Sequence, residues 1–375
     1  MKTSRRLALK MEKTILHLTC MRSTKYGGLE HYFVETARQC NRFSYKTVVQ
    51  YDELPRSNVY QHDLNNLGVD IIALKLKLNP LKLAKLIYHM RPEVIHTHFA
   101  NKVILFATPI IAKMLGAHKV IHTEHSMPSP SEISIVRRYA YNCYDKVICV
   151  SNAISEILSY AGVNQNILST LYLGIFSYVK YSEELRHKFR DEFRISSQDK
   201  VLACIAFDTP FKGLDILLKS FQKVSRDRSD VHLIIIGVDP DRSQLPTMAR
   251  DLGISGCVHW AGIRDEGWQV LTAADVYVQS SRFAEGLPLA IIEAMALKLP
   301  VVATRVAGVG EIVLDGENGL LCAPDDVDSL TVRMREMLSQ PDQWDKMGEA
   351  GYKRYMEMLR GEKSVETLIQ NYYFA

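Results

Sequence analysis

The strongest constraint on the fold is a regular alternation of two residue patterns along the chain. Short runs rich in Val, Ile and Thr, which favour β-strands, are separated by longer amphipathic segments that are typical of helices. We predict strands at 14–20, 45–51, 70–76, 93–99, 118–125 and 145–151, and again at 200–207, 231–237, 257–262, 275–281, 300–306 and 319–323. Such alternation is typical of βαβ units, so the chain should be an α/β protein with parallel sheets covered by helices.

The alternation breaks once, and the break indicates two domains. A charged, helix-prone stretch at 181–193 follows the first set of strands before the alternation resumes, so we place the boundary within 177–198. A length of 375 residues also exceeds what one core usually supports. We expect one α/β domain at 13–180, a second at 195–340, and helices at 341–375 that pack across both.

Composition indicates an ordinary globular protein. Hydrophobic residues make up 47% of the chain and charged residues 23%, and no apolar run reaches the roughly 20 residues that cross a bilayer. Residues 1–12 are basic, lack the apolar core of a signal peptide, and are expected to form a disordered leader. The seven cysteines show no CxxC spacing, which is typical of reduced thiols in a cytoplasmic protein.

Charge is divided unevenly between the two halves of the chain. Residues 1–180 carry 23 Lys and Arg against 12 Asp and Glu, whereas the remainder carries 23 against 30. The basic first half favours an anionic partner, such as an anionic membrane surface or an acidic glycan. No helix-turn-helix or RNP-like pattern supports nucleic acid as that partner.

Two loops that follow predicted strands carry glycine at the start of a helix. Gly27 and Gly28 follow the first strand, and Lys212 stands beside Gly213 after the first strand of the second half. Glycine lets a ligand approach the backbone, and the free N–H groups of a helix start attract phosphate. An ordinary tight turn would explain Gly27 and Gly28 equally well, and a Lys-Gly pair such as Lys212-Gly213 is by itself commonplace. No GxGxxG segment follows a strand, which argues against nicotinamide and flavin dinucleotides.

The segment RFAEGLPLAIIEAMALKLPVVATRV (282–306) holds two carboxylates inside an otherwise apolar helix pattern. Pro288 suits the first turn of a helix, where its missing N–H costs nothing. Glu285 would then lie just before the helix and Glu293 within it, so the two carboxylates could reach different ends of one extended ligand. The backbone amides of 286–288 would be available to a diphosphate between them.

These motifs together resemble one enzyme family. AEGLPLAIIEAMALKLPVVAT is similar to the E-x7-E signature of the retaining family 4 glycosyltransferases, and VAGVGEIVLDGENGLLCAPDD to the family's continuation of that domain. YGGLEHY resembles the family's glycine loop, while VIHTHF and VIHTEHS resemble strands of its acceptor domain. The resemblance covers roughly residues 14 to 340 and implies the GT-B fold, in which two Rossmann-like parallel-sheet domains face each other across a cleft and helices close the C-terminus.

The resemblance also implies a role for each matching residue. Glu293 would bind the ribose hydroxyls of a nucleotide-diphosphate sugar, and Glu285 the hydroxyls of the transferred sugar. Lys212 would neutralise the diphosphate, and His125 would lie near the sugar C6 hydroxyl and the reaction centre. The remaining donor contacts would come from Gly27, Gly28, Ile263, Gly286, Leu287 and Pro288. We take His125, Glu285 and Lys212 as the candidate catalytic residues, with no metal or cofactor.

One position departs from the family in a way that concerns the chemistry. The family usually places an arginine five positions before the lysine, and this chain has Phe207 there. One positive contact to the donor diphosphate is therefore missing unless Arg22, Lys25 or another residue supplies it.

The basic N-terminal domain is expected to hold the acceptor, a glycan or lipid-linked glycan at the inner face of the cytoplasmic membrane. His98 is a candidate acceptor contact from the cleft, and Arg137 and Arg138, beside Tyr139 and Tyr141, are candidate contacts to an acceptor phosphate. The expected function is transfer of a sugar to a hydroxyl with retention of configuration, in the biosynthesis of cell-surface polysaccharide or lipopolysaccharide.

Other hypotheses use the same residues. A nucleotide-sugar epimerase would need no acceptor, and a non-catalytic sugar-nucleotide-binding subunit would tolerate Phe207. Asp239-Pro240-Asp241 has the DxD spacing of a metal site, but such pairs after a strand are typical of turns. His96, His98, His122 and His125 are candidate zinc ligands, but no carboxylate or cysteine completes the set.

Overall fold

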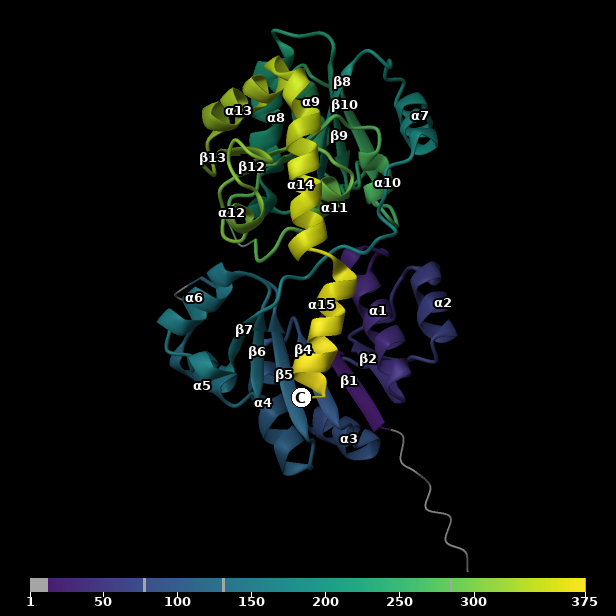
Figure 1. Cartoon of the computed structure of the whole chain (residues 1–375), viewed down its shortest axis with the longest axis vertical. Coiled ribbons are helices and arrows are strands. Elements are labelled where there is room, and N and C mark those ends of the chain that lie inside the picture. Colours follow the sequence, from purple (N-terminus) through teal and green to yellow (C-terminus); the bar gives the residue numbers. More distant parts are fainter. Residues whose placement is uncertain (1–12, 77–78, 130–131, 284, 375) are drawn as a thin grey trace, which may run out of the picture.

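The computed structural model describes residues 13–76, 79–129, 132–283 and 285–374, and the expected leader at 1–12 lies outside them. Two parallel sheets with helices on their faces form two domains, stacked along the long axis of the molecule (Figure 1). The predicted fold class is confirmed.

The first sheet has the strand order β3-β2-β1-β4-β5-β6-β7, and every pairing in it is parallel. Its strands are β1 (Lys13–Thr19), β2 (Tyr45–Tyr51), β3 (Asp70–Ala73), β4 (Val94–His98), β5 (Lys119–Glu124), β6 (Lys146–Cys149) and β7 (Leu168–Thr170). The helices of this domain are α1 (Gly28–Arg42), α2 (Asn58–Asn66), α3 (Pro80–Met90), α4 (Lys102–Met114), α5 (Ile135–Asn142) and α6 (Asn152–Tyr160).

The second sheet has the order β10-β9-β8-β11-β12-β13 and is also parallel. Its strands are β8 (Lys200–Ile205), β9 (Val231–Ile236), β10 (Val258–Gly262), β11 (Val276–Gln279), β12 (Val301–Thr304) and β13 (Gly319–Cys322). Its helices are α7 (Glu183–Glu192), α8 (Leu214–Ser225), α9 (Leu245–Asp251), α10 (Trp268–Leu271), α11 (Leu289–Ala296), α12 (Val309–Ile312) and α13 (Val327–Ser339), with a 3₁₀ turn at Pro210–Lys212.

The predicted strands are correct to within a few residues at their ends. The central strands are apolar runs buried on both faces, whereas the edge strand β3 has no buried residue. Val94 to His98 of β4 are all buried, as are all residues of β1 after Lys13. The sequence analysis missed β7, a strand of three half-buried residues at the sheet edge that carries no long apolar run.

Strand order reverses between β1 and β4 in the first sheet and between β8 and β11 in the second. At such a switch point the loops after neighbouring strands diverge and leave a crevice at the carboxyl ends of the strands. The two switch points face each other across the domain boundary, and this arrangement places the site.

The end of the chain returns to the first domain. Helix α14 (Trp344–Met358) packs against α11, and α15 (Gly361–Leu368) packs against α1, followed by a π-helical turn at Ile369–Tyr373 (Figure 1). Between these helices, Ile175 donates to the carbonyl of Leu359 at 3.0 Å and accepts from the amide of Gly361 at 2.9 Å. The two segments that connect the domains are therefore hydrogen-bonded to each other.

Candidate active site

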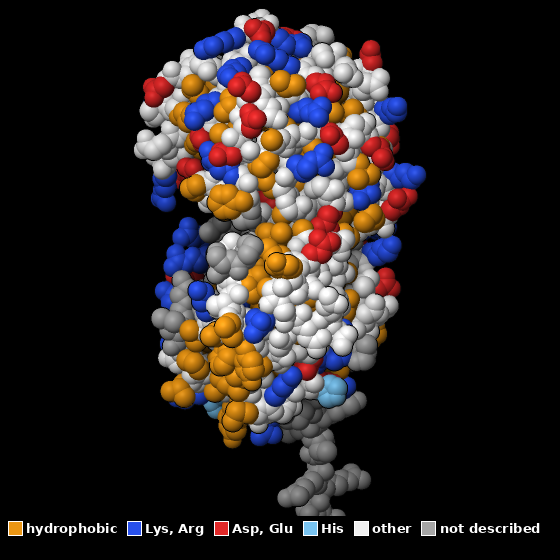
Figure 2. Space-filling model, turned by 90° about the vertical axis from the view of Figure 1, so that its left-hand side faces the viewer, with side chains coloured by type: hydrophobic (Ala, Val, Ile, Leu, Met, Phe, Trp, Pro, Cys, Tyr) orange, Lys and Arg blue, Asp and Glu red, His pale blue; other side chains and the backbone are white. Residues whose placement is uncertain are grey.

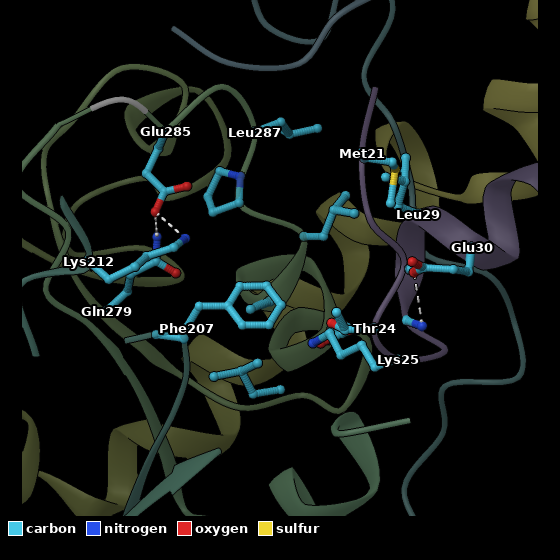
Figure 3. A pocket seen from close by; sticks show the side chains of 18 of the residues that line it. Met21, Thr24, Lys25, Leu29, Glu30, Phe207, Lys212, Gln279, Glu285 and Leu287 are labelled. Carbon is cyan, nitrogen blue, oxygen red and sulfur yellow. Dashed lines mark hydrogen bonds and ion pairs between the residues drawn. The ribbon is translucent and has the colours of Figure 1, made fainter. Parts of the chain in front are cut away.

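A cavity of about 370 Å³ lies where the two switch points meet (Figure 3). Four loops line it, each at the carboxyl end of a central strand. They contribute Met21, Arg22, Thr24, Lys25, Gly27, Gly28, Leu29 and Glu30 after β1, Phe99 after β4, Ile205, Ala206, Phe207 and Lys212 at β8, and Gln279, Glu285, Leu287, Pro288, Leu289, Ala290 and Glu293 at β11 and α11. The volume and the mixed polar lining fit a small-molecule site.

The second domain contributes a buried ion pair. Lys212 Nζ lies 2.6 Å from Glu285 Oε1, and the side chains of Gln279 and Ser281 donate to the same oxygen. Gly213 follows Lys212 with a φ of +62°, and a Cβ there would lie 2.1 Å from the carbonyl oxygen of Ser280. The loop can therefore approach β11 this closely only with glycine at this position, and this contact holds Lys212 opposite Glu285.

Helix α11 begins one residue later than the sequence analysis expected. Pro288 is extended and precedes the first helical residue, Leu289, so Glu285 lies outside the helix and Glu293 inside it. Proline has no N–H, and the first-turn amides without a helical acceptor belong to Leu289 and Ala290, which line the cavity. The free amides at the helix start are therefore those of Leu289 and Ala290, rather than the predicted ones at 286–288.

Glu293, like Glu285, is buried, and its burial shifts its pKa. Burial in the cavity floor raises the pKa of Glu293 to about 7, and the charge of Lys25 opposes that rise. An uncharged carboxyl below neutral pH and a carboxylate above it would both accept hydrogen bonds from ligand hydroxyls, the carboxylate more strongly.

The carboxylate of Glu30 accepts hydrogen bonds from the glycine loop of the first domain. Glu30 accepts from the amide of Gly27 at 3.2 Å and from Ser23 Oγ at 2.9 Å. The amide of Gly27 is therefore engaged rather than free for phosphate, while Gly28 begins α1 beside the cavity. Burial raises the pKa of Glu30, and its hydrogen bonds to Ser23 and Gly27 oppose the rise.

Phe207, which stands where the family usually has arginine, carries a cation from the other domain. The ammonium of Lys25 lies over the Phe207 ring at 4.9 Å from its centroid, and both residues line the cavity (Figure 3). A cation is favoured over the face of an aromatic ring. The position of the missing arginine is thus filled by a lysine that crosses the cleft.

His125 and Gly286 form a backbone contact between the domains. A Cβ on Gly286 would lie 2.0 Å from the carbonyl oxygen of His125, so only glycine permits this approach. The imidazole of His125 stacks on Phe99, with ring centroids 4.2 Å apart and planes at 11°. Phe99 lines the cavity, whereas His125 lies behind Phe99 and is not among the lining residues.

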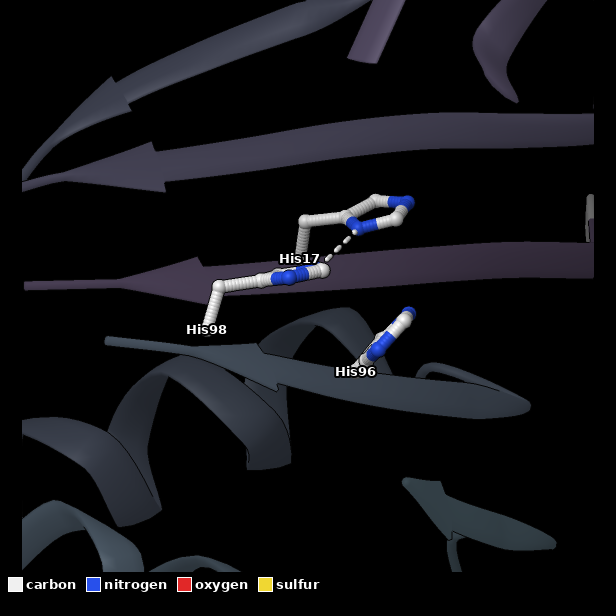
Figure 4. Close-up of side chains that lie close together, drawn as sticks. All are labelled: His17, His96 and His98. Atoms are coloured by element: carbon white, nitrogen blue, oxygen red, sulfur yellow. Dashed lines mark hydrogen bonds between the residues drawn. The ribbon is translucent and has the colours of Figure 1, made fainter. Parts of the chain in front are cut away.

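A chain of imidazoles leads from the core of the first sheet to His125. His17 Nδ1 lies 3.1 Å from His98 Nε2 (Figure 4), and His98 Nδ1 lies 3.0 Å from His125 Nε2. Burial lowers the pKa of His17 and of His125 to about 3 and also depresses the pKa of His98, so all three are neutral and each carries one proton.

The hydrogen bonds among His17, His98 and His125 determine which nitrogen of His125 is protonated. His17 Nε2 has no hydrogen-bond partner in the described part of the chain, and a buried N–H without an acceptor is costly. The network therefore favours protonation of His17 and His98 at Nδ1. His17 then donates to His98 Nε2, and His98 donates to His125 Nε2. His125 then carries its proton on Nδ1.

The histidines do not form the zinc set considered from the sequence. His122 lies on the opposite face of the sheet, where its ring bonds Thr97. Nitrogens of His17, His96 and His98 do lie within 4.8 Å of one another. His96 is hydrogen-bonded through both nitrogens, to Tyr373 and Thr123, so the cluster is accounted for by hydrogen bonding. Asp239 of the DxD segment accepts from the amide of Asp241 and closes a turn.

The predicted acceptor residues are not gathered at the cavity. His98 is fully buried with both ring nitrogens engaged, so a direct acceptor contact by its side chain is not supported. Arg137 turns inward to bond Glu124 at the end of β5 and Tyr141 one turn further along α5, whereas Arg138 is exposed. Ile263 is 49% exposed after the edge strand β10, outside the residues that line the cavity.

Two carboxylates of the second domain bind loops of the first. Asp265 accepts from the amide of Tyr26 at 2.6 Å and from Ser57 Oγ at 2.9 Å. Glu311 accepts from the amides of Asn152 and Ala153, both at 2.8 Å, at the start of α6. These contacts lie on opposite sides of the cavity and hold the domains together.

Sequence reasoning did not single out Glu30, Gln279 or Ser281. A usable signal existed for Glu30, since a glutamate three residues after a helix N-cap commonly bonds the N-cap amide. Gln279 and Ser281 became recognisable only once β11 and the loop at 285 were placed together in space.

Two family models match this chain, one over each domain. The model for "Glycosyl transferases group 1" matches residues 186–354, and the model for "Glycosyltransferase Family 4" matches residues 26–175. Between them they account for both domains. The chain belongs to these glycosyltransferases and is an enzyme of the GT-B type.

Individual relatives are distant. N-acetyl-alpha-D-glucosaminyl L-malate synthase of Bacillus anthracis is 25% identical, covering 78% of this chain and 77% of its own. The lipopolysaccharide core biosynthesis glycosyltransferase LpsE of Rhizobium meliloti is 24% identical, covering 93% and 95%. The structure of Anabaena HepE in complex with UDP-glucose superposes with a TM-score of 0.80 at 20% identity, covering 96% and 98%, which supports the fold.

The described residues include no helix that is both long enough and apolar enough to cross a membrane.

Proposed function

We propose that this glycosyltransferase moves a sugar from a nucleotide-diphosphate sugar to a hydroxyl of a glycan or lipid-linked glycan, with retention of configuration and without a metal ion. The observation that carries the proposal is the cavity itself, in which the Lys212–Glu285 pair faces the start of α1 and the Lys25 ammonium. Anabaena HepE, of the same fold, was crystallised with UDP and with UDP-glucose.

In this proposal the second domain binds the donor. Glu293 accepts from the ribose hydroxyls, and Glu285 accepts from the sugar through the oxygen that Lys212 does not bond. The amides of Leu289 and Ala290 face the diphosphate at the positive end of α11. Lys212 shifts from Glu285 to a phosphate oxygen once the donor is bound.

The chemical step breaks the bond between the anomeric carbon and the diphosphate oxygen. The acceptor oxygen bonds the same carbon from the same face, and its proton passes to the departing phosphate. Negative charge therefore grows on the diphosphate, and fixed cations nearby lower the barrier. His125, with its proton on Nδ1, donates to a hydroxyl of the transferred sugar.

Lys25 takes the part of the missing arginine. Its ammonium is held over Phe207, the residue at the arginine position, and its charge acts on Glu293 across the same cavity. The second cation on the diphosphate thus comes from the first domain rather than from the second. Closure of the cleft would then be required to complete the charge around the leaving group.

The first domain is proposed to hold the acceptor, in cell-surface polysaccharide or lipopolysaccharide biosynthesis. The name of the Rhizobium meliloti relative describes lipopolysaccharide core biosynthesis, and that relative covers nearly this whole chain. The excess of basic residues in 1–180 favours a phosphate-bearing acceptor at an anionic, cytoplasmic membrane surface.

A panel of UDP-, GDP- and ADP-sugars tests the proposal in two stages. One donor should raise the thermal stability of the chain by mass action, and the same donor should yield a glycosylated product with an extract of lipid-linked glycans. Products formed from donor alone would indicate an epimerase. Donor binding without transfer, unchanged by Glu285→Gln, would indicate a non-catalytic subunit and would contradict the proposal.

A further inference from the structure

An apolar patch covers part of the first domain (Figure 2). It is formed by exposed side chains of two adjacent helices, Phe106, Ile110 and Met114 on α4 and Ile135, Val136 and Tyr139 on α5. Met114 is 81% exposed and Ile135 75%. The rings of Phe106 and Tyr139 lie 6.2 Å apart and join the two helices into one surface.

The core does not explain this patch. Residues 106, 110 and 114 follow one another at intervals of four along α4, so they form a stripe on its outer face. The inner face of the same helix already supplies the core with Ile104, Leu105 and Ala112. A helix that is apolar on both faces is typical of one that binds a partner on its outer side.

The charged residues on the helices of the patch are all basic, and one exposed acidic residue, Glu132, lies just before α5, where it interacts electrostatically with Lys102 and Arg137. The sequences of α4, α5 and the neighbouring α3 contain six Lys and Arg and no Asp or Glu. Lys113 is paired with Asp145 and Arg137 with Glu124, whereas Lys102 and Arg138 extend exposed from α4 and α5. The helices of the second domain differ, since α8 and α13 each mix acidic with basic residues.

We propose that the apolar patch docks on an anionic lipid bilayer, with Met114, Ile135 and Val136 in the interface and Lys102 and Arg138 at the headgroups. Apolar side chains flanked by Lys and Arg bind anionic bilayers by burial and charge together. Charge complementarity distinguishes this partner from a second copy of the chain, which would bring the same basic helices face to face.

The patch lies on the domain that is proposed to hold the acceptor. Phe99 lines the cavity, and α4 begins three residues later and runs away from the cavity for 13 residues, or about 20 Å. A bilayer that contacts the patch would lie against the first domain, with the far end of the patch about 20 Å along α4 from the cavity. Docking on a bilayer would bring the enzyme to a lipid-linked acceptor, and in this respect the inference rests on the proposed function. Binding to a bilayer can itself be measured without catalysis.

Cosedimentation with vesicles tests the patch directly. The full chain should sediment with vesicles of phosphatidylcholine and phosphatidylglycerol and much less with phosphatidylcholine alone. Met114→Glu combined with Ile135→Glu should lower binding by at least about tenfold, and Lys102→Glu combined with Arg138→Glu by a similar factor. The matched control is Val332→Glu combined with Tyr160→Glu, two exposed sites outside the patch, which should sediment like the wild type.

Unchanged thermal unfolding and donor binding in each variant would show that the fold is intact. Equal sedimentation of wild type and both patch variants would overturn the proposal, as would a dimer in analytical ultracentrifugation that Met114→Glu and Ile135→Glu dissociate. A chain that binds vesicles through the patch yet transfers no sugar would leave the docking surface standing and remove the proposed function instead.

Discussion

The two walls of the cavity hold their charges in different ways. On the wall of the second domain, Glu285 is bonded by Lys212, Gln279 and Ser281, all from that domain. On the facing wall, Lys25 rests on Phe207, a residue of the opposite domain. The first wall is preorganised whether or not the cleft is closed, whereas the second gains its cation position only when the domains meet.

The two walls are therefore suited to different roles. A preorganised wall is suited to binding the donor and stabilising the charge that develops on the diphosphate. A cation that depends on the other domain is suited to linking chemistry to cleft closure. Asp265 and Glu311 link the two domains through hydrogen bonds outside the cavity.

The largest expected effect is on the preorganised wall. Lys212→Ala should lower kcat by about 10²- to 10³-fold, because a fixed positive charge beside the leaving group is lost. Lys219→Ala, on the exposed side of α8, is the matched control and should leave kcat unchanged. A kcat for Lys212→Ala within threefold of the wild type would remove Lys212 from the site.

A smaller loss is expected on the facing wall. Lys25→Met should lower kcat/KM by about tenfold, because the interaction of a partly solvated cation with the diphosphate is weakened by water. Lys75→Met removes a lysine that pairs with Glu53 outside the cavity and serves as control. Steady-state kinetics with saturating acceptor would measure both, and equal values would mean that Lys25 does not reach the donor.

The pH dependence of donor binding tests the role of Glu293. Ligand hydroxyls bind the carboxylate better than the neutral acid, and the pKa of Glu293 lies at about 7. The affinity for the donor nucleotide should therefore fall by up to about tenfold between pH 8 and pH 6. Calorimetry at several pH values would measure this, and Glu293→Gln should remove the dependence.

The same residue makes an opposite prediction for stability. The folded pKa of Glu293 lies above its ordinary value of 4.5, so the folded state binds more protons between pH 4.5 and about 7 and loses stability as pH rises through that window. Glu293→Gln should accordingly raise the free energy of unfolding at pH 8, by up to about 3 kcal/mol. A lower stability for the variant at pH 8 would contradict the burial argument.

The smallest effect is expected from the imidazole chain. His98→Leu should lower kcat by about fivefold with little change in the donor KM, because His125 would no longer be held in one tautomer. His98→Asn keeps a donor near the Nδ1 position and should restore most of the loss. If both variants lost activity in proportion to their thermal stability, the role of His98 would be structural only.

Much of this could be predicted from the sequence, for physical reasons. Parallel strands are buried on both faces, so their apolar runs mark them, and glycine, proline and glutamate at 285–288 mark a loop before a helix. The helix start at Leu289 required coordinates, because helix ends depend on local hydrogen bonds. The bond from the Gly27 amide to Glu30 had a sequence signal, the glutamate three residues after the N-cap, that the sequence analysis did not use.

Contacts between the domains were beyond prediction. Lys25 and Phe207 are far apart in the chain, and nothing local indicates that one rests on the other. The inward turn of Arg137 depends on Glu124, which belongs to a neighbouring strand. The exposed residues of α4 and α5 fit a helix pattern equally well as core or as surface, and only the packing separates them.

The central claim is that both walls supply a cation to the donor diphosphate, with Lys25 in place of the family arginine. The most direct measurement is kcat/KM for the wild type, Lys25→Met, Phe207→Arg and the double variant Lys25→Met/Phe207→Arg. The account predicts that the double variant recovers at least half of the wild-type value while Lys25→Met alone falls about tenfold. A double variant as slow as Lys25→Met, or a Lys25→Met variant as fast as the wild type, would contradict it.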